Sequence, residues 1–299
     1  LNYILDNFKN DLTITDNYGM NALMYAVTNR SYACAKILVD HIKDKCDTDT
    51  SQQIINQHNE IKETSILIAT KNEDAMTFKL THNTNNINVN CVDINGYSPL
   101  HYSIETHNLE IFDALTNNKT IDINIQDSEG NTPLMHSIKK GSDLITYKLL
   151  VCNGLELNKT NNYEQNIIGY ILDHKYSGKV KKDNDFNLVG YSKFDDYAQY
   201  PESLSTETLM MNMINTRSND LRSAFAPIEN NTTKLNKLVN YLIQKGVDLN
   251  SFDVYDKSLL MYAIDNKDKE VFNFLLNSDN LDINIHNNKG QTYLMYLFE

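Results

Sequence analysis

Apolar residues recur along the chain with the spacing of short, one-sided helices. Leu100, Ser103 and Ile104 stand at positions i, i+3 and i+4, which form one face of a helix. Ile111 and Leu115, four residues apart, mark a second apolar face shortly afterwards. The same second face is predicted at Leu149, Leu150, Leu275 and Leu276. This pattern predicts pairs of short helices that pack antiparallel, with polar turns between them.

One segment of the chain repeats at an offset of 34 residues. Residues 93–103, DINGYSPLHYS, return as residues 127–137, DSEGNTPLMHS. Weaker copies in the same register open at Asp16, Asn59, Asn161, Asp253 and Asn287. Self-similarity at a fixed period is the signature of stacked structural units. The sequence therefore predicts a repeat protein in which neighbouring helix pairs bury each other's apolar faces.

The turn chemistry of each copy agrees with this interpretation. Ser98 and Thr132 each precede a proline, so the hydroxyl can cap a helix that begins with proline. Glycine stands where the chain must turn with a positive φ, at Gly19, Gly96, Gly130 and Gly290. The predicted architecture is all-α, with turns that project between the helix pairs.

These residues resemble the ankyrin repeat, whose signature D-x-x-G-x-T-P-L-H-x-A opens a unit of about 33 residues. The segments 149–158 and 241–250 also match the family's L-L-x-x-G-A-D-V-N ending. The resemblance implies an ankyrin-repeat solenoid of stacked helix pairs with β-turn fingers over residues 1–299. Repeats start near residues 16, 59, 93, 127, 161, 253 and 287, after a partial repeat at 1–15. The last repeat stops within a first helix, so we expect more chain on at least one side.

The period breaks in two places. Between Asp16 and Asn59 the surplus falls on the polar run 44–53, which we interpret as an enlarged loop. Between Asn161 and Asp253 we place a long insertion at residues 176–232, within the repeat that starts at 161. Its aromatic cluster and its predicted helix at 203–215 leave three alternatives: folding back on the solenoid, a partner-binding protrusion, or disorder. The aromatic cluster consists of Leu188, Tyr191, Phe194, Tyr197 and Tyr200.

The sequence holds no pattern that indicates catalysis, a cofactor or a metal. Nucleotide-loop, nucleophile-elbow and metalloprotease motifs are absent. Asp195 and Asp196 are adjacent, so their side chains point apart and make a poor catalytic pair. His101 fills the motif's histidine position, which implies a turn-bracing role. The four cysteines are too widely spaced for a zinc site or a disulfide framework: Cys34, Cys46, Cys91 and Cys152.

The charge and hydropathy of the chain limit the kinds of partner that we expect it to bind. The formal net charge is −12, and the longest basic run, at residues 179–182, is followed at once by Asp183. A polyanion such as nucleic acid is therefore not an expected partner. No apolar stretch approaches the ~20 residues that cross a bilayer, so no membrane association is expected either. Reduced thiols indicate a cytoplasmic compartment.

The resemblance assigns binding to the fingers and first helices, which in ankyrin proteins line a groove for other proteins. Apolar tips are notable because aromatic residues are common interface anchors. We expect Tyr18, Tyr97 and Tyr255 to occupy corresponding tip positions on one side; the alternative is that such tips pack sideways onto neighbouring fingers. The candidate partner-binding residues are Tyr18, Met20, Ile94, Asn95, Tyr97, Glu129, Asn131, Lys139, Val254 and Tyr255.

The expected function is a non-enzymatic protein–protein interaction module. The alternatives are a structural component of a larger assembly, such as a viral particle, and an enzyme whose catalytic part lies in the insertion or elsewhere. The asparagine-rich, low-fidelity repeats look similar to ankyrin proteins of large DNA viruses of amoebae, and to some protist or intracellular-bacterial ones. That likeness implies an adaptor that acts on host proteins in the host cytoplasm, or a place in the virion. An F-box-like tail beyond Glu299 would favour the adaptor.

Overall fold

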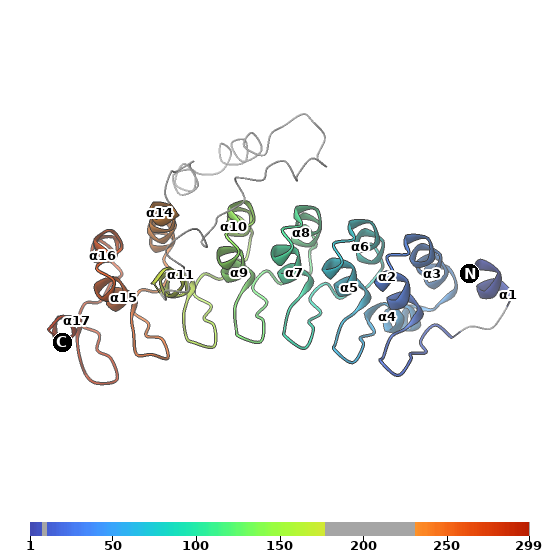
Figure 1. The fold of residues 1–299 in the computed structure, drawn as a ribbon, viewed down its shortest axis with the longest axis horizontal. Coiled ribbons are helices and arrows are strands. Elements are labelled where there is room, and N and C mark those ends of the chain that lie inside the picture. Colours follow the sequence, from blue (N-terminus) through green and yellow to red (C-terminus); the bar gives the residue numbers. More distant parts are fainter. Residues whose placement is uncertain (8–10, 177–230, 299) are drawn as a thin grey trace, which may run out of the picture. The chain divides into compact units, whose positions relative to one another are not determined.

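The computed structural model describes residues 1–7, 11–176 and 231–298, in two compact units, Leu1–Ser128 and Glu129–Glu299. Within each unit, helix pairs stand side by side, and a finger-like turn opens each repeat (Figure 1). Among the described residues no strand forms beyond two isolated bridges, Phe252 with Ser258 and His286 with Thr292. The predicted all-α repeat architecture is confirmed.

The first unit contains three helix pairs and two further helices. The pairs are α2 (Ala22–Thr28) with α3 (Tyr32–Lys45), α5 (Ser65–Lys71) with α6 (Ala75–His82), and α7 (Pro99–Glu105) with α8 (Leu109–Thr116). Contacts of α5 with α2 and α7 join neighbouring pairs. Two helices lie outside this pattern, α1 (Asn2–Asn7) and α4 (Thr48–Asn56).

The second unit repeats this arrangement. Its helices are α9 (Pro133–Lys139), α10 (Asp143–Leu150), α11 (Ile167–Tyr176), α14 (Asn231–Gln244), α15 (Leu259–Asp265), α16 (Lys269–Leu276) and α17 (Tyr293–Tyr296). Helix α11 contacts α9, α14 and α15, and α14 contacts α16. The residues between α11 and α14 include 177–230, so the insertion's aromatic cluster and helix at 203–215 lie outside the described residues.

The core lies between the helix pairs, as the apolar spacing predicts. Leu100 and Ile104 of α7 and Ile111 and Leu115 of α8 are fully buried. The predicted apolar faces of the second helices are confirmed for Leu149 and Leu275, which are buried. They are not confirmed for Leu150, which is half-buried, or for Leu276, which is 45% exposed. Adjacent residues on a helix point about 100° apart, so only one of each pair can face the core.

The turn chemistry of the repeats is also confirmed. The hydroxyls of Ser98 and Thr132 accept from the third backbone N–H of α7 and α9. His101 braces the same turn, because its Nδ1 accepts the Ser98 backbone N–H at 3.2 Å and completes a capping box. The four finger glycines have φ between 74° and 77°. His107, which stands where the family has glycine between the two helices, has a φ of 54°.

The predicted enlarged loop at residues 44–53 is wrong. Helix α3 continues to Lys45, and Thr48–Asn56 forms the helix α4. Asp47 caps this helix by accepting the Thr50 N–H at 2.8 Å. The polar run is the solvent face of an amphipathic helix whose apolar residues come only at its end, where Ile54 and Ile55 are buried. Asn21, the cap of α2, holds that end by donating to the Ile54 carbonyl at 2.9 Å.

Asparagine side chains hydrogen-bond the loops that follow successive second helices to one another. The Asn90 amide accepts the Asp122 N–H at 2.9 Å and donates to the Thr120 carbonyl at 2.7 Å. Asn250 makes the equivalent pair of bonds in the second unit. Each amide satisfies one donor and one acceptor of the next loop's backbone, which explains part of the asparagine enrichment in structural terms.

Candidate binding surface on the finger turns

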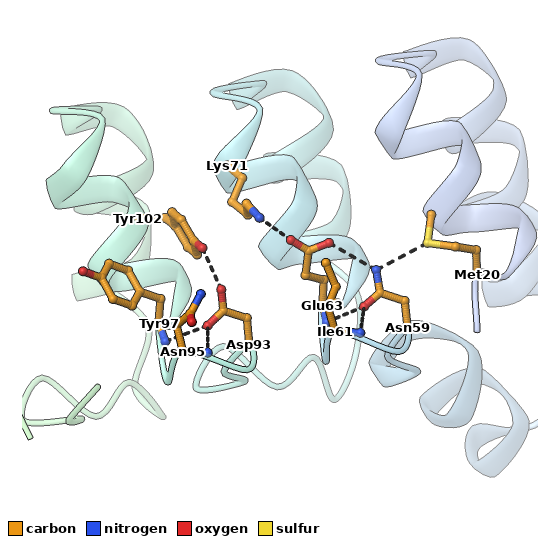
Figure 2. A network of polar contacts seen from close by, with 9 residues as sticks. All are labelled: Met20, Asn59, Ile61, Glu63, Lys71, Asp93, Asn95, Tyr97 and Tyr102. Carbon is orange, nitrogen blue, oxygen red and sulfur yellow. Dashed lines mark hydrogen bonds and ion pairs between the residues drawn. The ribbon is translucent and has the colours of Figure 1, made fainter. Parts of the chain in front are cut away.

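Each finger is organised by the side chain of its opening residue. Asp93 Oδ1 accepts the backbone N–H groups of Asn95 and Tyr97 at 2.9 and 3.0 Å (Figure 2). Asp16, Asn59, Asn161, Asp253 and Asn287 each accept the equivalent two bonds in their own fingers. The finger tips are therefore held in one backbone conformation, and the residues on them are presented in fixed positions.

A tyrosine on the first helix ties three of these fingers back to their helices. The Tyr102 hydroxyl donates to Asp93 Oδ2 at 2.7 Å, as Figure 2 shows. Tyr25 donates to Asp16 at 2.5 Å, and Tyr262 donates to Asp253 at 2.6 Å. Burial, together with the hydrogen bond to Asp93, raises the pKa of the Tyr102 hydroxyl. These braces are not among the predicted features, although an Asp and a Tyr nine residues apart recur in three repeats.

Neighbouring fingers are joined through their backbones. In the first unit, Glu60 donates its N–H to the Tyr18 carbonyl at 3.0 Å, and Ile94 donates to Ile61 at 3.2 Å. In the second unit, Val254 donates to Tyr163 at 3.0 Å. The second residue of a finger thus bonds to the third residue of the finger before it. This pairing sets the tips of successive fingers next to one another.

A polar network runs across the fingers and first helices of the first unit (Figure 2). The Asn59 amide donates to Glu63 Oε2 at 3.1 Å, and Glu63 forms an ion pair with Lys71 of α5. The Lys71 ammonium lies 5.3 Å from the centroid of the Tyr102 ring on α7. Met20 is half-buried, and its sulfur accepts a hydrogen bond from the Asn59 amide at 3.5 Å. The predicted site residue Met20 therefore joins two fingers.

Seven of the ten predicted site residues lie on the surface. Tyr18, Ile94, Val254 and Tyr255 are 68%, 58%, 50% and 60% exposed, and Asn95, Glu129 and Lys139 are also exposed. The other three are not free tips: Asn131 is buried, and Met20 and Tyr97 are half-buried. Asn131 is buried because it packs at the start of α9, where its Oδ1 accepts from Asn161 at 3.2 Å.

Tyr97 does not share a tip position with Tyr18 and Tyr255, so that prediction is wrong. Tyr18 and Tyr255 are the second residues after the opening aspartate, and Tyr97 is the fourth. The turn at the intervening glycine directs Tyr97 back toward its own first helix. Its ring centroid lies 5.5 Å from that of His101 and 5.4 Å from that of Tyr102.

Two exposed tip residues, Ile61 and Tyr163, are not among the predicted site residues, because their repeats match the ankyrin signature most weakly. Ile61 is 46% exposed and Tyr163 is 43% exposed. Each stands at the same place in its finger as Tyr18 and Tyr255, and the 34-residue offset from Asn95 or Glu129 would have identified it. The Tyr163 and Tyr255 rings stack, with centroids 6.3 Å apart and an interplanar angle of 15°.

The part of the chain that the structure describes has neither a side-chain group suited to a metal ion nor a membrane-spanning helix. There, no group of three or more His, Cys, Asp and Glu side chains is placed to hold a metal ion. Of the helices described, none is both long and apolar enough to cross a membrane.

The comparisons with known proteins agree with this geometry. Residues 47–161 match the family model described as ankyrin repeats (3 copies). An ankyrin repeat domain from Acinetobacter baumannii has a similar structure, with 16% identity, 85% of this chain and 95% of that one covered, and a TM-score of 0.53. The ankyrin repeat protein EF0377 is 15% identical over 89% of this chain and 100% of its own, with a TM-score of 0.55. No curated protein matches the sequence. Residues 47–161 therefore match the ankyrin-repeat family, and the chain has the ankyrin-repeat fold.

Proposed function

We propose that the chain binds a partner protein through its finger tips and the adjoining faces of its first helices, without a catalytic step. Ankyrin repeats generally mediate protein–protein interactions and are typically non-enzymatic. The observation that carries the proposal is a row of exposed apolar residues on three successive fingers of the first unit. This unit-1 tip row consists of Tyr18, Ile61 and Ile94, which are 68%, 46% and 58% exposed.

The rigidity of the fingers supports this proposal. The backbone bond between Ile94 and Ile61, and that between Glu60 and Tyr18, hold the three tips in register. A partner that packs against them does not have to order the loops first, so little of its binding energy is lost to loop entropy. Exposed large apolar side chains on a fixed backbone are suited to act as anchors at the centre of an interface. In its narrower form, the proposal is that the chain is an adaptor that acts on a host protein.

The proposal is tested by selecting displayed random peptides on the 299-residue chain and measuring the affinity of an enriched peptide by titration. We expect the combined variant Tyr18→Ser, Ile61→Ser and Ile94→Ser to weaken binding at least about thirtyfold, the scale of interface hot spots. The matched control is Met76→Ser with Tyr32→Ser. Both residues are exposed apolar side chains of second helices, 60% and 37% exposed, far from the fingers in sequence. Equal affinity for the tip variant and the control would contradict the proposal.

A further inference from the structure

The fingers of the second unit carry a cluster that differs from the unit-1 tip row. We call it the tyrosine–carboxylate cluster: Tyr163, Glu164, Val254, Tyr255 and Asp256. The two rings are stacked and remain 43% and 60% exposed. In the unit-1 tip row the corresponding fingers present one tyrosine and two isoleucines. The cluster therefore offers a paired aromatic surface.

Hydrogen bonds hold the backbone of both tyrosines in place. Tyr163 donates its N–H to Asn161 Oδ1 at 3.0 Å, and Tyr255 donates to Asp253 Oδ1 at 2.9 Å. The two fingers are then joined by the 3.0 Å bond from the Val254 N–H to the Tyr163 carbonyl. These bonds fix the backbone positions from which the two stacked rings project.

Each tyrosine is followed by a carboxylate in the same turn. Glu164 and Asp256 take the left-handed backbone conformation, with φ of 59° and 63°, and Glu164 is exposed. Asp256 Oδ1 accepts the Asn288 N–H at 2.9 Å, which holds its carboxylate at the tip. The neighbouring Lys257 is paired with Asp265 at 2.5 Å, and Lys289 is a cation on the next finger. The two tips that bear tyrosine thus combine aromatic rings with negative charge.

We infer that the tyrosine–carboxylate cluster binds an arginine side chain in a basic segment of the partner polypeptide. The inference rests on the proposed function and specifies its partner. A guanidinium group is planar, stacks on aromatic faces and pairs with carboxylates in a fixed fork. A lysine ammonium is more strongly hydrated and lacks the flat face. The formal net charge of −12 favours the approach of a basic segment.

The test uses three fluorescent peptides of repeated Gly-Ser-X units, in which X is arginine, lysine or glutamine. Their affinities for the 299-residue chain are measured by fluorescence anisotropy at low and at near-physiological salt. We expect the arginine peptide to bind at least about fivefold more tightly than the lysine peptide. The glutamine peptide should not bind detectably, because it carries no charge and no guanidinium plane.

Variants locate the binding. Tyr163→Ala with Tyr255→Ala should weaken the arginine peptide at least about tenfold, whereas Tyr163→Phe with Tyr255→Phe should keep most of the affinity because the rings remain. Glu164→Gln with Asp256→Asn should weaken binding and flatten its salt dependence, while the asparagine retains the Oδ1 acceptor for Asn288. The matched control is Tyr18→Ala, an exposed tyrosine of the unit-1 tip row, which should leave the affinity unchanged.

Lysine or glutamine peptides that bind as tightly as the arginine peptide would overturn the inference, as would unchanged affinity in the double alanine variant. These results are distinguishable from failure of the proposed function. If displayed peptides that depend on the unit-1 tip row are enriched, but the arginine peptide shows no dependence on the tyrosine–carboxylate cluster, the proposed function stands and this inference fails. If variants of neither set of tips affect any enriched peptide, both fail.

Discussion

Single residues decide how closely two fingers approach one another. A Cβ atom at Gly96, where φ is 75°, would lie 2.5 Å from the Ser128 backbone nitrogen. Lys62 and Glu164 take the same left-handed conformation with a full side chain. The conformation alone therefore does not require glycine at this place in the finger. Glycine is required at Gly96 because the backbone of the next finger lies too close to leave room for a Cβ atom. The sequence indicates the turn but not this close approach.

This difference gives a prediction for two glycine variants. We expect Gly96→Ala to lower the free energy of unfolding by about 3 kcal/mol or more, since backbone strain and a steric clash add. Gly154→Ala is the matched control, because φ there is 82° but nothing lies within 4 Å of the added Cβ. It should cost only the left-handed strain of about 1–2 kcal/mol. Urea denaturation measures both values, and equal losses would contradict the close-approach argument.

Between elements, a buried ion pair joins three helices of the second unit. Lys175 of α11 bonds Asp268, the cap of α16, at 2.5 Å, and Asn236 of α14 at 2.5 Å. The lysine and aspartate side chains are only 10% and 12% exposed. The Tyr176 hydroxyl adds a bond to Asp268 at 2.6 Å. The two helices that flank residues 177–230 are thereby fastened to α16.

Removing the buried ion pair between Lys175 and Asp268 should lower the free energy of unfolding more than removing an exposed ion pair. Asp268→Ala leaves Lys175 buried without its partner, so we expect a loss of about 3–5 kcal/mol in the free energy of unfolding. The control Asp265→Ala removes the pair with Lys257, whose side chains are 38% and 29% exposed, and should cost at most about 1 kcal/mol. Chemical denaturation followed by circular dichroism measures both. Losses of similar size would show that the buried pair does not fasten the helices.

The same contact makes stability depend on pH in a known direction. Burial raises the pKa of Asp268, but hydrogen bonds from Lys175 and Tyr176 outweigh it, so the folded pKa is below the ordinary value. A group with a lowered folded pKa stabilises the fold fully above its unfolded pKa, near 3.9. That contribution is lost as the pH falls through the lowered folded pKa. The Asp268→Ala variant should accordingly show a weaker loss of stability on acidification than the unmodified chain.

The sequence predicts the elements more reliably than the site. Ser98, Thr132 and the finger glycines act through local turn chemistry, so their roles are readable from a few residues. The sequence pattern predicts a loop in place of helix α4, because the apolar residues of this helix, Ile54 and Ile55, come only at its end. The exposure of Tyr97 depends on ring contacts with His101 and Tyr102, which the repeat pattern does not contain.

On the scale of the whole molecule, we propose that the finger tips, and not the second helices, contact the partner. In each unit the tips are exposed and fixed by backbone bonds, and large apolar or aromatic side chains recur on them. Stability in stacked repeats is spread over neighbouring pairs, so exposed tips can vary in sequence with little effect on folding. This separation lets the tips serve binding while the helices serve stability.

Photo-crosslinking tests the claim most directly. An enriched peptide that carries a diazirine group is bound to the 299-residue chain and irradiated, and the linked residues are identified by mass spectrometry. We expect links to finger residues 16–20, 59–63 and 93–97 of the first unit, or 161–165 and 253–257 of the second. Links confined to the second helices α3, α6, α8, α10 and α16 would contradict it.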